Sequence, residues 1–449
     1  MSISEALKGA IADVQRMSSH QERIRGVIKY FKVLGQEVLG IVAMAPYAAR
    51  SYLLYACSLP EWKAEGSIQP SVSIRRNVRY GKNPRNHMDI YVPGANATGA
   101  GEFGRKEKTR FPIALFCHGG VWASGSKWHY APIACFLAQC GVITAIMEYS
   151  LYPDAKTDAM VGEVSEALDW VMDSCATLFH GDGTDVTLIG HSAGAQLCCL
   201  SLLQRAQDSN RKMPRQFVGM AGVYNIERHF EYECQRGVEH LSTMERAVGG
   251  RDNFFINSPS AILRAYVLEK GTYFTESILS QDTEDTTQFH GDDIRKRAGI
   301  TDFVHPMDDS YQDTNHADAR RMMSESEKKF HDSFDEQYIE RLGVNGKQGE
   351  GGNTCMLPNM YLMASSCDMT VPWYESAELH TMLQCSGMKR SRLLLYNRVG
   401  HGDFVVDWYP AFDSNGKLSC SQTSQGLDQL PPFASDLIRI LKRDRARCH

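Results

Sequence analysis

The segment around Ser192 constrains what this chain can fold into more than any other. An apolar, β-type run at 186–189 is followed by Gly190, His191, Ser192, Ala193 and Gly194, and a helical pattern starts directly afterwards. A serine in a sharp turn between a strand and a helix presents its hydroxyl at the edge of a sheet, and glycines two residues away on each side leave room for that turn. The pattern therefore predicts that Ser192 is a nucleophile on a strand–turn–helix elbow.

A glycine pair lies upstream, again directly after an apolar run. Residues 112–117 lead into His118, Gly119 and Gly120, which has the form of an oxyanion loop because backbone N–H groups can turn toward a substrate oxygen where no side chain intervenes. We expect the N–H groups of Gly119, Gly120 and Ala193 to hold the negative oxygen formed during attack on a carbonyl, at roughly 3 kcal/mol per donor. His118 is expected to support this loop.

Two loops further along the chain complete a catalytic triad. The β-type run 359–364 leads to Asp368, and the run 392–396 leads to His401. Taken alone, each residue has an ordinary interpretation, as a turn aspartate and as a packed or surface histidine. Together with Ser192 they follow the order serine, acid, histidine that is typical of α/β-hydrolases. We predict that His401 takes the proton of Ser192 and that Asp368 orients the imidazole.

Two side chains next to these motifs are candidates for contact with substrate. Trp122 follows the glycine pair and either lines the pocket or packs beneath the loop. His191 directly precedes the nucleophile, and we assign it to substrate binding together with Trp122. Chemistry of this kind needs no metal and no organic cofactor, so none is expected.

Strand and helix patterns alternate through most of the chain. Strands are expected at 73–80, 87–92, 112–117, 142–149, 186–189, 217–222, 359–364 and 392–396, and helices at 128–140, 159–179, 195–205 and 434–443. Alternation of this kind favours a mostly parallel sheet with helices on both faces. The expected fold class is therefore α/β, and the order of the triad makes it an α/β-hydrolase.

An apolar segment near the N-terminus lies outside this pattern. Residues 38–57 are about as long as a bilayer span, but Pro46 and Arg50 interrupt them. We expect an interfacial helical hairpin, a weak membrane anchor that contacts a membrane surface, or a cap over the active-site mouth. On this basis residues 1–66 form a helical leader, and residues 67–449 form the catalytic domain.

An acidic, polar stretch interrupts the catalytic domain. Between 268 and 355 the strand and helix pattern fails, and we expect a surface insertion with one charged helix at 317–342. The histidines in this stretch lack the fixed spacing of a ligand set, which favours a solvated loop over a metal site.

Composition limits the cell compartments and the kinds of partner that we expect for this protein. The 449 residues have a formal net charge of −5, which gives no reason to expect nucleic acid. The 13 cysteines are scattered and have no zinc-like spacing with histidine, as expected in a reducing compartment. The first residues are polar and lack the features of a cleaved secretory signal. We therefore expect an intracellular protein that binds neither metal nor nucleic acid.

Several separated blocks resemble the isoprenylcysteine methylesterase branch of the α/β-hydrolases, close to the hormone-sensitive-lipase-like esterases. The elbow GHSAGAQ and the HGG loop are specific only to the superfamily. The apolar leader and the region 222–263 are similar to this branch in particular, and so are the blocks RRNVRYGKNPRNHMDIYVP, CDMTVPWYESAEL and VGHGDF. Two features depart from the family pattern, namely His191 in place of glutamine and the long acidic insertion.

The resemblance implies a reaction and a location. The reaction is hydrolysis of the carboxyl methyl ester of a prenylated cysteine, in a small molecule or a protein, and the products are a carboxylate and methanol. The implied location is the endoplasmic-reticulum or Golgi membrane, with the cytoplasm as the alternative. Three other functions stay open: a broad carboxylesterase or lipase-like enzyme, a kynurenine-formamidase-like amidase, and a non-catalytic hydrolase-fold binding module.

Overall fold

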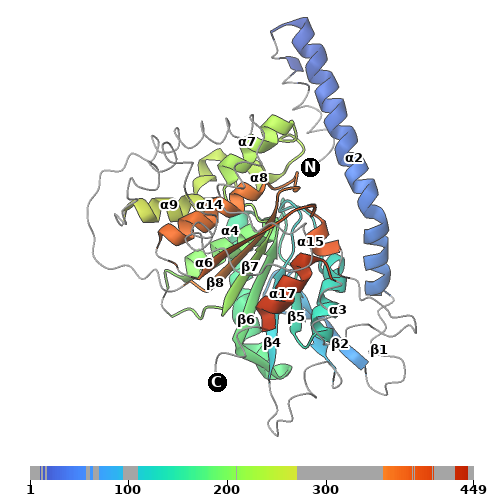
Figure 1. Ribbon diagram of the computed structural model, residues 1–449, viewed down its shortest axis with the longest axis vertical. Coiled ribbons are helices and arrows are strands. Elements are labelled where there is room, and N and C mark those ends of the chain that lie inside the picture. Colours follow the sequence, from blue (N-terminus) through green and yellow to red (C-terminus); the bar gives the residue numbers. More distant parts are fainter. Residues whose placement is uncertain are drawn as a thin grey trace, which may run out of the picture.

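One mixed β-sheet forms the centre of the molecule. The structure, a computed structural model, describes residues 11, 14–15, 18–56, 61–63, 70–94, 110–208, 210–269, 357–386, 388, 390–406, 408 and 430–442. Nine strands within these residues form a single sheet in the order β1-β2-β3-β5-β4-β6-β7-β8-β9. Figure 1 shows this sheet running through the body, with helices in front of it and behind it.

The sheet has an antiparallel edge and a parallel remainder. The antiparallel pairs join β1 (Glu61–Lys63), β2 (Pro70–Arg79), β3 (His87–Pro93) and β5 (Ile143–Met147) in that order. From β5 onward all pairs are parallel, through β4 (Phe111–Cys117), β6 (Gly181–His191), β7 (Gln216–Met220), β8 (Asn359–Ser365) and β9 (Ser391–Tyr396). Parallel strands end at the same edge of a sheet, so the loops after β4, β6, β8 and β9 meet there.

Alternate side chains of the strands enter two separate cores. In β4, Ile113 and Leu115 belong to one buried cluster, whereas Ala114 and Phe116 belong to the other. The first cluster is completed by α4 (Thr157–Trp170), α6 (Ala193–Arg205) and α14 (Trp373–Cys385), and the second by α3 (Ala131–Gln139) and α17 (Pro432–Lys442). Because successive residues of a strand point to opposite faces, a strand covered on both faces is apolar throughout. This three-layer arrangement confirms the expected α/β-hydrolase fold.

Shorter helices fill the connections. They are η1 (Lys127–Tyr130), η2 (Val171–Cys175), α5 (Ala176–Leu178), α7 (Ile226–Arg236), α8 (Met244–Ala247), η3 (Arg251–Asn253), η4 (Phe255–Asn257), α9 (Pro259–Glu269) and α15 (Asp403–Val406). The helix predicted at 128–140 is split, because a 3-10 turn precedes α3 and Pro132 occupies its first turn. The helix predicted at 159–179 passes through a π-helical turn between α4 and α5.

The N-terminal apolar segment lies within one long helix. Helix α2 (His20–Ala56) continues through Pro46, so the prediction of a hairpin is wrong. Figure 1 shows α2 along one side of the molecule and extending past it. The hydroxyl of Tyr47 lies 2.7 Å from the carbonyl oxygen of His129 and 2.9 Å from that of Val405, so this part of α2 packs on η1 and α15. Among the helices that the structure describes, none is both long and apolar enough to cross a membrane.

Two predictions about the acidic insertion are not tested by the structure. All but the first two residues of the segment 268–355 lie outside the described residues, and so does the helix predicted at 317–342. The division into a leader at 1–66 and a catalytic domain at 67–449 stays a prediction.

Candidate active site

Ser192 lies at the tip of a sharp turn between β6 and α6. Its backbone angles, φ 54° and ψ −125°, fall in a region that L-residues rarely adopt. The neighbouring glycines are required by space: a Cβ on Gly190 would lie 2.5 Å from the Cα of Ala195, and one on Gly194 would lie 2.4 Å from the carbonyl oxygens of Cys117 and His118. The strained turn places the serine at the N-terminus of α6, where the helix dipole favours negative charge.

Asp368 and His401 form a buried pair on the loops after β8 and β9. Nδ1 of His401 is 2.8 Å from Oδ2 of Asp368. The other carboxylate oxygen accepts hydrogen bonds from the N–H groups of Thr370, at 2.8 Å, and Val371, at 2.9 Å. Burial alone would raise the pKa of Asp368, but the imidazole of His401 and these N–H groups outweigh it and lower that pKa below its ordinary value.

The state of this pair fixes the tautomer of the histidine. Because Asp368 is a carboxylate, it can only accept a hydrogen bond, so the proton of His401 sits on Nδ1. Nε2 then has a free lone pair, as a general base requires. The side chain of His401 is 19% exposed, whereas that of Asp368 is fully buried.

The elbow and the loop of His401 lie side by side. The imidazole rings of His191 and His401 have centroids 4.9 Å apart, and Nε2 of His191 lies 3.1 Å from the carbonyl oxygen of His401. His191 is adjacent to Ser192 in the chain. The fold thus brings the three predicted triad loops, which are far apart in sequence, to one edge of the sheet.

The glycine loop after β4 lies against the elbow. A Cβ on Gly119 would be 2.9 Å from the carbonyl oxygen of His191 and 3.0 Å from the Cβ of Ser192, so a side chain there would force the loop and the elbow apart. The N–H of Gly119 donates to the hydroxyl of Tyr130 at 3.0 Å, which differs from its predicted role as an oxyanion donor. Gly120 has a φ of 129°, and Val121 also has a positive φ, of 46°, so the backbone reverses direction here.

Three backbone N–H groups of the glycine loop and the elbow form no hydrogen bond. Within the described part of the chain, the N–H groups of Gly120, Val121 and Ala193 have no hydrogen-bond partner. Two of them, Gly120 and Ala193, were expected from the sequence. Val121 was missed because it carries a side chain, whereas the motif is read from glycines. Together these donors can hold a negative oxygen beside Ser192.

The two residues assigned to substrate contact are packed inside the protein. Trp122 is 1% exposed, and its Nε1 donates to Oε1 of Gln196 at 3.0 Å. His191 is 5% exposed, and both of its ring nitrogens have polar neighbours, since Nδ1 lies 3.4 Å from the hydroxyl of Tyr130. We therefore correct both assignments: Trp122 packs beneath the loop, and His191 connects parts of the site.

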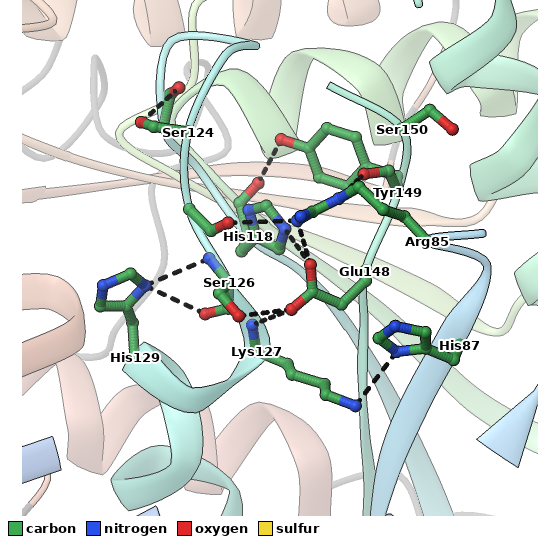
Figure 2. Close-up of polar contacts among 12 residues, drawn as sticks. Arg85, His87, His118, Ser124, Ser126, Lys127, His129, Glu148, Tyr149 and Ser150 are labelled. Carbon is green, nitrogen blue, oxygen red and sulfur yellow. Dashed lines mark hydrogen bonds and ion pairs between the residues drawn. The ribbon is translucent and has the colours of Figure 1, made fainter. Parts of the chain in front are cut away.

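His118 lies between the glycine loop and the side chains of Tyr149 and Glu148, as Figure 2 shows. Its ring stacks on Tyr149 with centroids 4.4 Å apart, and the Tyr149 hydroxyl donates to the carbonyl oxygen of His118 at 2.9 Å. Nδ1 of His118 lies 2.8 Å from the carbonyl oxygen of Gly119. Burial lowers the pKa of His118 to about 4, so the ring is neutral at pH 7 and can donate this bond from Nδ1.

Glu148, directly after β5, contacts the other part of the loop (Figure 2). Its carboxylate accepts hydrogen bonds from the hydroxyl of Ser126 and from the N–H of Lys127, the latter at 2.9 Å. It also forms an ion pair with Arg85. Sequence reasoning missed Glu148; the signal was a single charged residue in the β-type run 142–149.

Metal ligands are not gathered at this site. The described part of the chain holds no group of three or more His, Cys, Asp or Glu side chains that could bind a metal ion.

Comparison with known proteins agrees with this architecture. The family model described as alpha/beta hydrolase fold matches residues 114–251, which include the glycine loop and the elbow. Esterase B from Lactobacillus rhamnosis, solved as an inhibited form, is similar in fold, with a TM-score of 0.50 at 14% identity over 94% of this chain and 100% of that chain.

Curated relatives are similar over about half of their length. The probable isoprenylcysteine alpha-carbonyl methylesterase of Oryza sativa subsp. japonica is 28% identical over 48% of this chain and 51% of the relative. The isoprenylcysteine alpha-carbonyl methylesterase of Arabidopsis thaliana is 28% identical over 46% of this chain and 48% of its own. The kynurenine formamidase of Danio rerio is 26% identical over 34% and 46%. The chain therefore has the α/β-hydrolase fold, and about half of it is similar to the isoprenylcysteine alpha-carbonyl methylesterases.

Proposed function

We propose that this protein is a serine esterase that hydrolyses carboxylic esters. One observation carries the proposal: His401 is joined to Asp368 at 2.8 Å, and its backbone carbonyl lies 3.1 Å from the ring of His191, the residue next to Ser192. A strained serine, a histidine held in the basic tautomer and open backbone donors are the parts that acyl transfer requires.

The reaction follows from these roles. Nε2 of His401 takes the proton of the Ser192 hydroxyl as its oxygen attacks the ester carbonyl. The negative oxygen is held by the open N–H groups of Gly120, Val121 and Ala193. The protonated imidazole then gives its proton to the leaving alcohol, and an acyl-enzyme remains. Water, activated by the same nitrogen, releases the carboxylic acid and restores the serine.

For the substrate we propose the methyl ester of a prenylated cysteine. The support is the similarity to proteins named isoprenylcysteine alpha-carbonyl methylesterases, which extends over 48% and 46% of this chain. A formamidase activity is the second candidate, because kynurenine formamidases are similar over a shorter part of the chain. A broad carboxylesterase would use the same catalytic groups.

A substrate panel tests both parts of the proposal. We expect hydrolysis of S-farnesylcysteine methyl ester with a kcat/KM at least ~10-fold above that for N-formylkynurenine and for short-chain nitrophenyl esters. A higher kcat/KM on N-formylkynurenine would replace the methylesterase proposal by the amidase. Ser192→Ala should lower kcat by ~10⁴-fold or more on every substrate of the panel. A variant with near-normal turnover would end the esterase proposal.

A membrane-associated location, at the endoplasmic reticulum or Golgi, is proposed together with this substrate. The support comes from α2, in which Ile24, Ile28 and Phe31 expose 48%, 61% and 72% of their surface. Exposed apolar side chains on a helix are typical of segments that bind the surface of a bilayer.

A further inference from the structure

Two buried side chains, Tyr130 and His191, stand between the glycine loop and the loop of His401. Tyr130 ends η1 and is 6% exposed, and His191 ends β6 and is 5% exposed. The Tyr130 hydroxyl lies 3.0 Å from the nitrogen of Gly119 and 3.4 Å from Nδ1 of His191. Nε2 of His191 lies 3.1 Å from the carbonyl oxygen of His401. Four groups from three separate loops thus form one continuous line of hydrogen-bond contacts, from the N–H of Gly119 to the carbonyl of His401.

The chemistry of these groups gives the line a single direction. Burial, with a contribution from His401, lowers the pKa of His191 to about 3, so the ring is neutral and carries one N–H. A carbonyl oxygen can only accept a hydrogen bond, so the proton must be on the Nε2 that faces His401. Nδ1 is then an acceptor, and the hydroxyl of Tyr130 must donate to it.

The other end of the line agrees with this direction. Burial raises the pKa of Tyr130, so its hydroxyl keeps its proton. This proton takes part in the hydrogen bond to His191. The lone pairs of the tyrosine oxygen can therefore accept a hydrogen bond, which the N–H of Gly119 donates. Each donor meets one acceptor from Gly119 to the carbonyl of His401.

We propose that Tyr130 and His191 are positioning residues that couple the glycine loop to the histidine loop, and so set the distance between the oxyanion donors and the base. This inference rests on the proposed esterase function. The line ends on the backbone of the residue before the open N–H of Gly120 and on the backbone of His401 itself. A shift at either end therefore changes how well the site fits the transition state, in which both the oxyanion donors and the base act.

Tyr130→Phe tests the tyrosine. The phenyl ring keeps the volume but leaves the N–H of Gly119 without an acceptor and Nδ1 of His191 without a donor. We expect kcat to fall ~10-fold while KM changes by less than about 2-fold, because substrate groups are not removed. Tyr396→Phe is the matched control, because its buried hydroxyl bonds Oδ2 of Asp436 at 3.0 Å instead; its kcat should stay within about 2-fold of wild type.

A pair of substitutions tests the histidine. His191→Gln keeps a donor group, its NH2, and an acceptor, its C=O, whereas His191→Leu keeps neither. We expect the leucine variant to lose at least ~10-fold in kcat and the glutamine variant to recover most of that loss. If His191 had a purely structural role, both substitutions would lower kcat by the same factor. Equal rates for these two variants, or a Tyr130→Phe rate equal to that of Tyr396→Phe, would overturn the coupling.

A spectroscopic measurement checks the line without turnover. In protein labelled with ¹⁵N-histidine, His191 should be neutral with its proton on Nε2 from pH 5 to pH 8, and a proton on Nδ1 would overturn the assigned direction. The outcomes also separate the two proposals. Ser192→Ala with near-normal activity refutes the esterase, whereas equal glutamine and leucine rates in an enzyme that does depend on Ser192 refute only the coupling.

Discussion

At the residue scale, the candidate chemistry depends on how one carboxylate is held. Asp368 receives two backbone N–H groups and the imidazole of His401, and its side chain is fully buried. A group with so many donors stays ionised and keeps the histidine in one orientation. The orientation and the tautomer of His401 are therefore set by the loop after β8.

Replacement of Asp368 by asparagine tests this dependence. The amide can donate to Nδ1 of His401 and then favours the tautomer with its proton on Nε2, which cannot accept the serine proton. We expect kcat to fall ~10³- to 10⁴-fold with little change in secondary structure by circular dichroism. A variant that keeps more than a tenth of the wild-type kcat would show that the carboxylate of Asp368 does not determine the tautomer of His401.

Glu148 gives a prediction about stability and pH. Burial would raise the pKa of Glu148, but His118, Ser126, Lys127 and Arg85 lower it below its ordinary value. A carboxyl group with a lowered folded-state pKa stabilises the fold above its unfolded pKa, near 4.3, and this contribution is lost as pH falls through the folded value.

Glu148→Gln should therefore be less stable than wild type at pH 7, by roughly 3 kcal/mol in urea unfolding, because the partners of a buried charge are left unpaired. The difference should begin to shrink as pH falls below about 4.3, and it should be lost once pH is below the lowered folded-state pKa, where the wild-type carboxyl group is also neutral. Asp169→Asn is the control, since it removes ion pairs with Arg205, at 2.6 Å, and Arg211, at 2.5 Å, that do not involve the glycine loop. An equal deficit for Glu148→Gln at pH 7 and pH 3 would contradict this account.

At the scale of elements, the turn between β6 and α6 shows most clearly why the sequence has glycine at its two flanking positions. The glycines that flank Ser192 are needed because other backbone occupies the room that their side chains would fill. The loops of the site are less independent than their sequence separation suggests, since η1, β6 and the loop after β9 are joined through Tyr130 and His191.

Two glycine-to-alanine substitutions in neighbouring helices should have opposite effects. A Cβ on Gly194 would lie 2.4 Å from two carbonyl oxygens, whereas Gly162, in α4, has no atom within 4 Å of its Cβ position. We expect Gly162→Ala to raise the free energy of unfolding by ~0.5–1 kcal/mol and Gly194→Ala to lower it by several times as much. Thermal unfolding of both variants checks this, and a stabilised Gly194→Ala would show that the turn is not so crowded.

Most elements could be predicted because their residue patterns are local. The runs 112–117 and 359–364 lie within one residue of β4 and β8, since both read as continuous apolar or β-type segments between turns. The hairpin at 38–57 was wrong because Pro46 was read as a break. A proline inside a helix removes one hydrogen bond, and packing of Tyr47 and the buried Ser51 against the body can offset that loss.

The contacts within the site could not be predicted in the same way. The hydrogen bond from Gly119 to Tyr130 depends on how the 3-10 turn η1 places a side chain eleven positions away. Likewise, His191 faces His401 across 210 residues of sequence. Such contacts depend on tertiary packing, which one sequence does not encode as a local pattern.

At the scale of the whole molecule, α2 is the element that sets this protein apart from a compact three-layer domain. Part of it packs on η1 and α15 next to the site, and its N-terminal part exposes apolar side chains. One part contacts the elements next to the candidate site, and the other carries the exposed apolar side chains on which the proposed contact with a lipid surface rests.

Flotation with liposomes tests the proposed surface contact. We expect the full chain to float with phosphatidylcholine–phosphatidylserine vesicles, and Ile28→Glu combined with Phe31→Glu to lower the bound fraction ~10-fold or more, because two charges replace buried apolar area. Esterase activity on a soluble ester should be the same for both proteins. A wild-type chain that stays at the bottom of the gradient would leave α2 with a role as a cap only.

Labelling with a fluorophosphonate probe tests the central claim most directly, since the probe reacts only with a serine that its surroundings make nucleophilic. We predict that folded protein is labelled at Ser192, as located by peptide mass spectrometry, and that labelling is lost after heat denaturation and in His401→Ala. Folded protein that stays unlabelled, or that is labelled at another residue at the same rate with and without His401, would contradict the account.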